Sequence, residues 1–139
     1  MRITTRGRYA LRASLALVKF HNLGSPVSVN QLSGEEQISS VFLEQIFFKL
    51  RKAGLVNSVR GPGGGFLFAK SPELITLKEI LEAAGEELDV TDCDKNAKTC
   101  KLTGKKCSSH VVWEDVTRFL DEYFSKITLS MVIARGIPE

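Results

Sequence analysis

Apolar residues recur at helical spacing through the first third of the chain. Residues 5–21 predict an amphipathic helix, and Ser28 can cap a second helix that runs to about Glu36. After a turn at 37–40, a serine can cap a third helix, which Gly54 ends at the position after its C-cap. The apolar residues of this third helix fall at i, i+3, i+4 and i+7: Leu43, Ile46, Phe47 and Leu50.

The pattern then changes to one that is typical of strands. Residues 55–60 and 66–69 predict two strands, and the glycine-rich segment 61–65 between them predicts a hairpin turn. Thr76 and Glu79 form a capping-box pattern that opens a short helix to about residue 84. Three helices followed directly by a hairpin are typical of a winged helix-turn-helix, so the predicted fold class is mostly α with a small β-hairpin.

The last predicted helix runs from Ser109 to about Lys126. Its apolar positions form a face that is wide for a lone terminal helix. These positions are Val112, Trp113, Val116, Phe119, Leu120, Tyr123, Phe124 and Ile127. With the polar segment before it, this helix divides the chain into residues 1–87, 88–108 and 109–139.

Composition places the chain among globular proteins. Its 139 residues, of which 43% are hydrophobic, suit one domain with an appendage. No apolar run is long enough to span a membrane, and no apolar core follows the charged N-terminus, so we expect a cytoplasmic protein with no membrane partner.

Charge is distributed unevenly along the chain. Residues 1–70 hold ten Lys and Arg against three Asp and Glu, a net +7, whereas residues 71–139 hold nine against thirteen, a net −4. A basic half joined to an acidic half is consistent with a polyanion-binding module, although ordinary surface charge gives the same count.

The third helix supplies candidate contacts to DNA bases. In a helix-turn-helix the N-terminal residues of the second helix of the motif meet base edges in the major groove. Here these residues are Ser39, Ser40, Phe42, Glu44 and Gln45. Glutamate accepts from cytosine N4 and repels phosphate, so Glu44 is expected to discriminate between sites; a solvated helix residue is the alternative reading.

The glycine-rich hairpin tip is a second candidate DNA contact. Arg60 precedes Gly61, Gly63 and Gly64, which allow a close backbone approach, and an arginine at such a tip can enter a narrow minor groove. A plain hairpin turn needs fewer glycines, and the segment lacks the lysine and following helix of a phosphate-binding loop. Candidate phosphate contacts are Arg2, Arg6, Arg8, Lys49, Arg51 and Lys52.

All three cysteines lie in one polar segment, together with a histidine. Cys93, Cys100, Cys107 and His110 are separated by six, six and two residues. In a helix, successive cysteines would be about 10 Å apart along the axis, too far for one compact metal site, so the segment is predicted to be a folded-back loop. Cys107 and His110 would share a face if the first turn there were helical. Five nearby lysines, at 95, 98, 101, 105 and 106, are expected to lower the thiol pKa values.

This donor set leaves more than one metal open. Zinc accepts three thiolates and an imidazole, but its structural sites usually have gaps of two to four residues. Gaps of six suit an iron–sulfur cluster better. Three exposed loop cysteines without a metal are the plain alternative. A thiol enzyme is disfavoured because the chain has no CxxC motif and no placed base, since His21 is expected at a helix end.

Three segments resemble the IscR family of bacterial iron–sulfur cluster regulators: residues 1–10, 42–47 and 55–66. The resemblance covers about residues 1–135. It implies a winged-helix transcriptional regulator, not an enzyme, that binds double-stranded DNA as a homodimer. It also implies a [2Fe-2S] cluster, supplied by a cluster-assembly scaffold, on Cys93, Cys100, Cys107 and His110. Cluster occupancy would change which sites are bound, and the regulated genes are typically those of cluster assembly.

The resemblance also assigns a role to the last helix and separates this chain from one related branch. The helix would form the dimer interface through Val112, Trp113, Val116, Phe119, Leu120, Tyr123 and Phe124. Each inter-cysteine gap is one residue longer than in that family. The nitric-oxide-sensing relatives take an acidic ligand near the N-terminus, where this chain has Arg8, which disfavours a [4Fe-4S] cluster.

Overall fold

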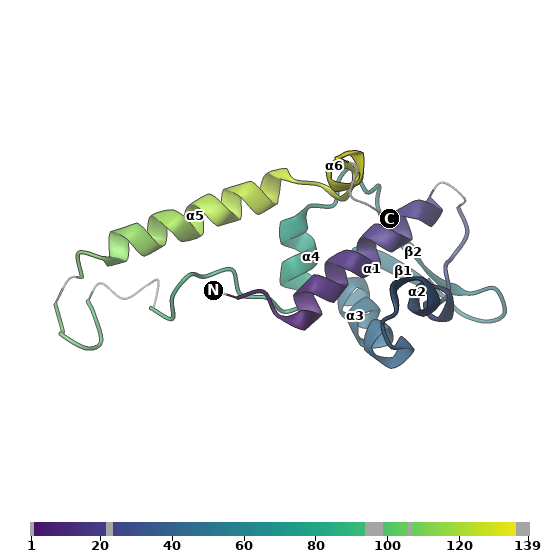
Figure 1. Cartoon of the computed structure of the whole chain (residues 1–139), viewed down its shortest axis with the longest axis horizontal. Coiled ribbons are helices and arrows are strands. Elements are labelled where there is room, and N and C mark those ends of the chain that lie inside the picture. The colour runs from purple at the N-terminus through teal and green to yellow at the C-terminus, as the bar shows by residue number, and fades with distance from the viewer. Residues whose placement is uncertain (1, 22–23, 94–98, 106, 136–139) are drawn as a thin grey trace.

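The protein is described by a computed structural model that covers residues 2–21, 24–93, 99–105 and 107–135 (Figure 1). The elements, in chain order, are α1 (Thr5–His21), α2 (Val29–Glu36), α3 (Ser40–Lys52), β1 (Val56–Val59), β2 (Gly65–Phe68), α4 (Leu77–Ala83), α5 (His110–Lys126) and α6 (Leu129–Ala134). The predicted fold class is confirmed: a helical winged-helix body with one small hairpin, from which α5 extends as a long arm.

The helix ends follow the predicted capping chemistry. The hydroxyl of Ser28 accepts from the N–H of Gln31 at 3.1 Å, and that of Ser39 accepts from the N–H of Phe42 at 3.1 Å. Thr76 opens α4 with a complete capping box. Each cap satisfies a backbone donor that has no partner inside its helix, so these serines and threonine fix where the helices begin.

The core lies where α1, α2, α3 and the sheet meet. The predicted apolar stripe of α3 is confirmed, since Leu43, Ile46, Phe47 and Leu50 are all at most 1% exposed. Phe47 stacks on Phe66 of β2 with ring centroids 4.9 Å apart. The inward face of α3 is therefore fixed by packing, which leaves its opposite face outward.

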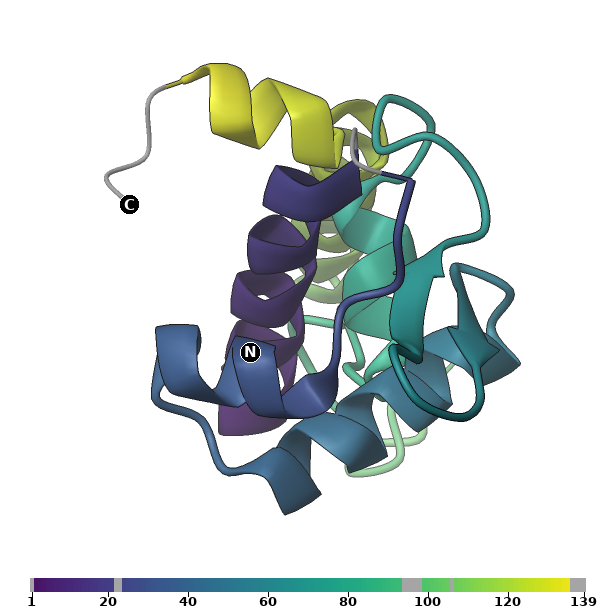
Figure 2. The same ribbon diagram turned by 90° about the vertical axis from the view of Figure 1, so that its right-hand side faces the viewer.

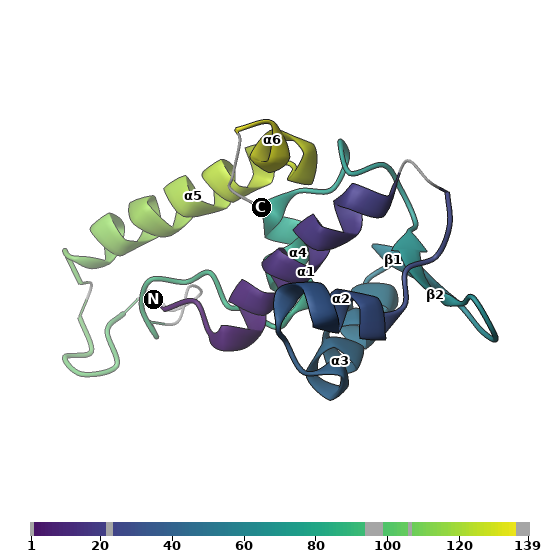
Figure 3. The same cartoon turned by 45° about the vertical axis from the view of Figure 1, so that its right-hand side comes forward.

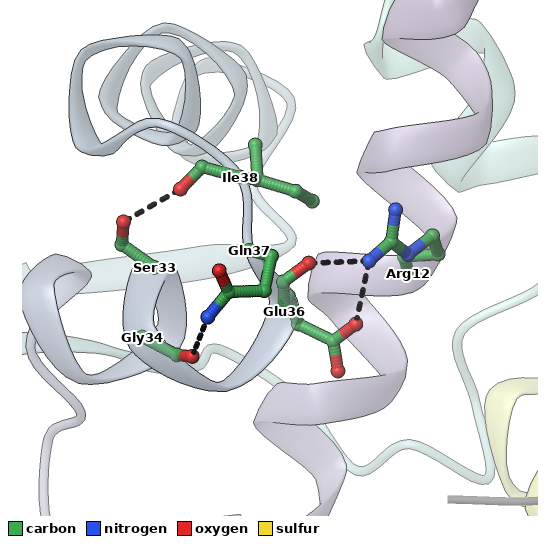
Figure 4. A network of polar contacts seen from close by, with 6 residues as sticks. All are labelled: Arg12, Ser33, Gly34, Glu36, Gln37 and Ile38. Carbon is green, nitrogen blue, oxygen red and sulfur yellow. Dashed lines mark hydrogen bonds and ion pairs between the residues drawn. The ribbon is translucent and has the colours of Figure 1, made fainter.

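The turn between α2 and α3 is held by a small polar network (Figure 4). Gln37 has a φ of 56°, and its side-chain amide donates to the carbonyl of Gly34 at 2.7 Å. Ser33 donates to the carbonyl of Ile38 at 2.6 Å, and the Arg12 guanidinium of α1 pairs with the Glu36 carboxylate at 3.2 Å. This network ties the end of α2 to α1 and holds the turn that leads into α3.

The hairpin is also anchored to the helical motif. β1 and β2 pair antiparallel from Val56 with Phe68 to Val59 with Gly65. Beyond this pairing, Val27 and Phe66 exchange two backbone hydrogen bonds of 2.9 Å. Because Val27 immediately precedes the cap of α2, the hairpin and the helix-turn-helix form one unit.

The C-terminal end differs from the prediction. Ile127 does not continue the apolar face of α5: its backbone is extended, and its side chain is buried in the core. The unpredicted α6 follows and crosses the end of α1 (Figure 2), with Leu129 fully buried. Backbone hydrogen bonds from the N–H of Leu77 to the carbonyl of Ile127, and from the N–H of Leu129 to the carbonyl of Ile75, attach the chain between α5 and α6 to the start of α4. The residues after α5 therefore belong to the winged-helix core.

Candidate functional site

The outward face of α3 presents three of the residues expected to contact DNA: Glu44, Gln45 and Lys49. Val41, Glu44, Gln45, Phe48 and Lys49 line a shallow, open depression on this face. Val41 is 65% exposed and Phe48 is 53% exposed. An exposed helix face beside a hairpin, with polar groups among apolar ones, has the shape and chemistry to read base edges.

Two predicted base contacts have structural roles. Phe42 is half-buried, and its ring packs edge-on against Tyr9 of α1 with centroids 5.7 Å apart, so it does not lie on the outward face of α3. The Ser39 hydroxyl is the cap of α3. The position of Phe42 beside the cap gives no sign in the sequence of the neighbouring α1 ring.

Sequence reasoning missed Val41 and Phe48 as members of this face. Both are apolar, whereas the face was predicted from polar residues and Phe42. The sequence did contain a sign of their exposure. Neither Val41 nor Phe48 belongs to the buried i, i+3, i+4, i+7 stripe of the helix, and Phe48 directly follows the buried Phe47. An apolar residue that the helical period places outward is a candidate contact for a thymine methyl group or another apolar surface.

The hairpin formed by β1, β2 and the turn between them, which we call the wing, carries Arg60 on an exposed stretch of backbone. Gly61 and Gly63 have φ values of 92° and 74°, which favour glycine. A Cβ atom on Gly64 would lie 2.2 Å from the Val59 carbonyl oxygen. The glycines are therefore needed for the tight turn itself as well as for close approach to a ligand.

The predicted basic residues are partly engaged within the protein. Arg51 donates to the Ser58 hydroxyl of β1 at 3.1 Å and lies over the Phe48 ring at 5.5 Å, so it braces α3 against the wing. Arg8 donates to Thr5 at 3.1 Å. Arg2 and Lys52 are exposed.

The cysteine segment leads into the first turn of α5. The N–H of Cys100 donates to the carbonyl of Lys105 at 2.8 Å, and the N–H of His110 donates to the carbonyl of Cys107 at 3.2 Å. Cys93 and His110 line the same pocket, of about 420 Å³, between residues 89–93 and α5. α5 begins at His110, so Cys107 lies before the helix, and the condition for a helical face shared by Cys107 and His110 is not met.

Hydrogen bonding favours the thiolate at two of the cysteines. The N–H groups of Leu102 and Thr103, with the Thr103 hydroxyl, hold the pKa of Cys100 below its ordinary value. The Ser109 hydroxyl, 3.0 Å from the sulfur, and the N–H groups of Ser109 and His110 lower the pKa of Cys107, whereas the charge of Cys100 acts the other way. In the described part of the loop, these hydrogen bonds, rather than the charges of Lys101 or Lys105, lower the pKa values of the two thiols. Lys95, Lys98 and Lys106 lie outside the described residues.

The four candidate ligands surround the start of α5 without converging. Within the described ranges, no three His, Cys, Asp or Glu side chains lie close enough together to hold one metal ion. The imidazole of His110 instead contacts the Glu114 carboxylate at 3.1 Å. All three cysteines are free thiols. Ligation by all four residues would therefore require the loop to close toward His110.

The outer face of α5 is apolar and uncovered. No residue of this helix is buried. Val112, Val116, Phe119 and Tyr123 follow one another at helical spacing and are 52, 37, 68 and 45% exposed, and Trp113 beside them is 40% exposed. Leu120 and Phe124, also predicted for an interface, are half-buried, and Phe124 packs against the core of the same chain. The stripe of Val112, Val116, Phe119 and Tyr123, with Trp113 beside it, is therefore the part of the predicted set that one chain leaves open.

Comparison with known proteins decides the family. The model of the Rrf2 family, described as an iron-dependent transcriptional regulator, matches residues 3–135. The chain belongs to the Rrf2 family. Within it, the chain is 39% identical to the HTH-type transcriptional regulator IscR of Erwinia tasmaniensis, over 96% of this chain and 79% of that protein.

Two solved Rrf2-like structures have the same fold. IscR of T. potens is 28% identical, with a TM-score of 0.75 over 99% of this chain and 89% of that one. CymR, named as the global cysteine regulator of B. subtilis, is 25% identical, with a TM-score of 0.80 over 97% and 98%. These relatives are regulators rather than enzymes, so this Rrf2 protein is a winged-helix transcriptional regulator. No helix within the described residues is long and apolar enough to cross a membrane.

Proposed function

We propose that this Rrf2 regulator binds a [2Fe-2S] cluster through Cys93, Cys100, Cys107 and His110, and that cluster occupancy selects which DNA sites it binds. The observation that carries the proposal is the donor set itself. Three free thiols and one imidazole flank the first turn of α5, and hydrogen bonds lower the pKa of two of the thiols. Iron–sulfur clusters are held by thiolates, with histidine as an alternative ligand.

The residues fit such a group in chemistry. The charge of Cys100 acts on the pKa of Cys107, and Cys93 and His110 line one pocket. The thiols are at the surface, where a donor protein can reach them. When bound, the cluster would supply redox sensitivity and join parts of the loop that are otherwise separate. The Glu114 carboxylate next to His110 would orient the imidazole.

We further propose that the protein works as a homodimer on double-stranded DNA in the cytoplasm. The open stripe of α5 supports the dimer, since apolar faces of this kind mark interaction sites. The outward face of α3 would enter the major groove, with the wing along the neighbouring minor groove. The names of the IscR relatives support control of cluster-assembly genes, with an assembly scaffold as the cluster donor.

An anaerobic visible spectrum, with iron, sulfide and zinc counted on the same sample, tests the cluster. We expect charge-transfer bands with equal iron and sulfide, which are lost in Cys100→Ser and kept in Ser108→Ala, a control in the same loop. A colourless protein that carries one zinc per chain, even after attempted cluster reconstitution, would overturn the cluster and support a zinc-stabilised regulator with the same DNA module.

Glu44→Ala is expected to change site preference by roughly tenfold and to alter the average affinity less, because one base contact contributes about 1–3 kcal/mol of discrimination. The measurement uses duplexes that the wild-type protein selects from a random pool. Glu35→Ala, which removes an equally exposed carboxylate on α2, is the matched control. Equal changes at all selected sequences would remove Glu44 as a discriminator.

Arg60→Ala is expected to weaken binding by about tenfold at selected sites with a narrow minor groove and by less elsewhere, since the groove potential there attracts arginine. Fluorescence anisotropy on two duplexes that differ only in an A-tract beneath the wing measures this difference. Arg118→Ala, which removes the same charge from the exposed side of α5, controls for net charge. A loss that is the same on both duplexes would contradict minor-groove entry.

A further inference from the structure

Glu86 is the one charged residue that is buried in the described part of the chain, at 8% exposed. Its Oε1 atom accepts hydrogen bonds from the N–H groups of Thr4 at 3.1 Å and Gly7 at 3.2 Å, and the Thr4 hydroxyl also donates to it. These donors lie at the start of α1, where backbone N–H groups have no partner within the helix and the helix dipole favours a negative charge. Glu86 therefore caps α1 from a distant part of the sequence.

The backbone of Glu86 is held by the end of α4. Gly85 has a φ of 95°, and its N–H donates to the carbonyl of Glu82 at 3.0 Å, while the N–H of Glu86 donates to the carbonyl of Leu81 at 2.9 Å. This pair of bonds is the Schellman arrangement at a helix C-terminus. It directs the Glu86 side chain toward α1.

Gly7 is matched to this carboxylate. A Cβ atom at Gly7 would lie 2.5 Å from Oε1 and 2.6 Å from Cγ of Glu86. Gly7 has no positive φ, so its need for glycine comes from this contact rather than from its backbone conformation. The absence of a side chain at Gly7 lets Glu86 reach the helix end.

The segment after Glu86 leads directly into the cysteine loop. Leu88 is buried, and the N–H of Val90 donates to the Thr117 hydroxyl of α5 at 3.2 Å. Cys93 follows three residues later. Figures 1 and 3 show this segment leaving α4 and running beside the start of α1 before it turns out toward the loop. Residues 86–93 are thus attached to α1 at one end and to α5 and the cysteine loop at the other.

We propose that Glu86 is a positioning residue that couples the state of the cysteine loop to the placement of α1, and through α1 to DNA binding. This inference rests on the proposed function. Ligation of a cluster by Cys93 and His110, which line one pocket, would fix the far end of the segment that begins at Glu86 and displace that segment. The Glu86 carboxylate passes that displacement to the first turn of α1, which carries Arg6 and Arg8. Tyr9, one position on, packs against Phe42 of α3, so the recognition helix would shift as well.

The test compares the DNA affinities of the cluster-loaded and metal-free protein, for the wild type, Glu86→Ala, Glu86→Gln and the control Glu87→Ala. The probe is the duplex that the loaded wild type selects from a random pool, and iron and sulfide are counted for each sample. In Glu86→Ala we expect the ratio of the loaded to the metal-free affinity to move toward one by about fivefold or more, with unchanged cluster content. In Glu87→Ala this ratio should stay at the wild-type value. Glu86→Gln, which keeps an acceptor oxygen but loses the charge, should give an intermediate ratio and serves where the alanine variant does not fold.

Amide hydrogen exchange of the N-terminal peptide gives a second readout. We expect the amides at Thr4 and Gly7 to exchange faster in Glu86→Ala, and Gly7→Ala to reproduce both the faster exchange and the reduced ratio. Equal weakening of both affinities, with the ratio unchanged, would make Glu86 a structural cap only and overturn the proposal. A wild-type ratio of one would instead overturn the proposed function itself, so the two failures are distinguishable.

Discussion

Phe119→Asp is expected to convert the protein to a monomer and to weaken its binding to a two-fold symmetric site by about a hundredfold or more. Phe119 is 68% exposed at the centre of the open stripe of α5. Truncating a central aromatic anchor commonly costs about 2–4 kcal/mol of association energy, and a charge there adds the cost of desolvating a carboxylate. Sedimentation and fluorescence anisotropy on the same sample measure the two effects.

Ser125→Asp is the matched control for this prediction. Ser125 is exposed on the side of α5 away from the stripe, so the substitution adds the same charge to the same helix without entering the interface. This variant should remain a dimer with wild-type affinity. A dimeric Phe119→Asp protein, or a wild type that is monomeric at micromolar concentration, would show that the stripe is not the interface.

Gly65→Ala is expected to lower the free energy of unfolding by about 2–4 kcal/mol and to weaken binding to all selected duplexes. Gly65 has a φ of 152°, and a Cβ atom there would lie 2.1 Å from the Val27 carbonyl oxygen. That carbonyl accepts one of the two hydrogen bonds that join β2 to the start of the helix-turn-helix. The added methyl group would therefore separate the wing from the motif. Thermal unfolding and anisotropy measure the two losses.

Gly63→Ala separates this contact from backbone strain alone. Gly63 has a positive φ of 74°, but a Cβ atom there would meet nothing within 4 Å. Its expected cost is only that of the left-handed backbone, about 1–2 kcal/mol. Equal unfolding temperatures for Gly65→Ala and Gly63→Ala would contradict the claim that the close contact of Gly65 with Val27 holds the wing against the rest of the domain.

The features that sequence reasoning predicted well are those that neighbouring residues determine. Ser28 and Thr76 cap helices through donors three residues away, and the period of Leu43, Ile46 and Leu50 marks a buried face without reference to any partner. Local hydrogen bonds and helical geometry suffice for such predictions. The same reasoning located the wing, because its glycines serve a turn that is formed within five residues.

What could not be predicted depends on contacts between distant residues. The packing of Phe42 against Tyr9 could not be predicted, because Tyr9 is far away in the sequence. Glu86 gave no signal as a cap for α1, since its donors lie 79 and 82 residues earlier. The short α6 was missed because six residues carry little periodicity, and its burial comes from packing across α1.

The cysteine loop shows a further limit. Residue types alone identify a thiolate and imidazole donor set, but the spacing does not determine how the loop closes. The structure brings Cys93 to the pocket of His110 and Cys107 to the turn before α5, while no three of the four side chains, all of them among the described residues, come close together. The hydrogen bonds that lower the pKa of Cys100 come from backbone N–H groups and the Thr103 hydroxyl, and those at Cys107 come from the Ser109 hydroxyl and backbone N–H groups. The sequence does not show that the chain turns so as to point these donors at the sulfur atoms.

The central claim is that occupancy of the cysteine site changes DNA binding. The most direct measurement is the affinity of one wild-type preparation for its selected duplexes, first anaerobically with a full complement of iron and sulfide and then after removal of the metal. The account predicts that at least one duplex class changes in affinity by about tenfold or more, with the fold retained in both states. Unchanged affinity for every duplex, in a protein shown to have held and then lost its cluster, would contradict it.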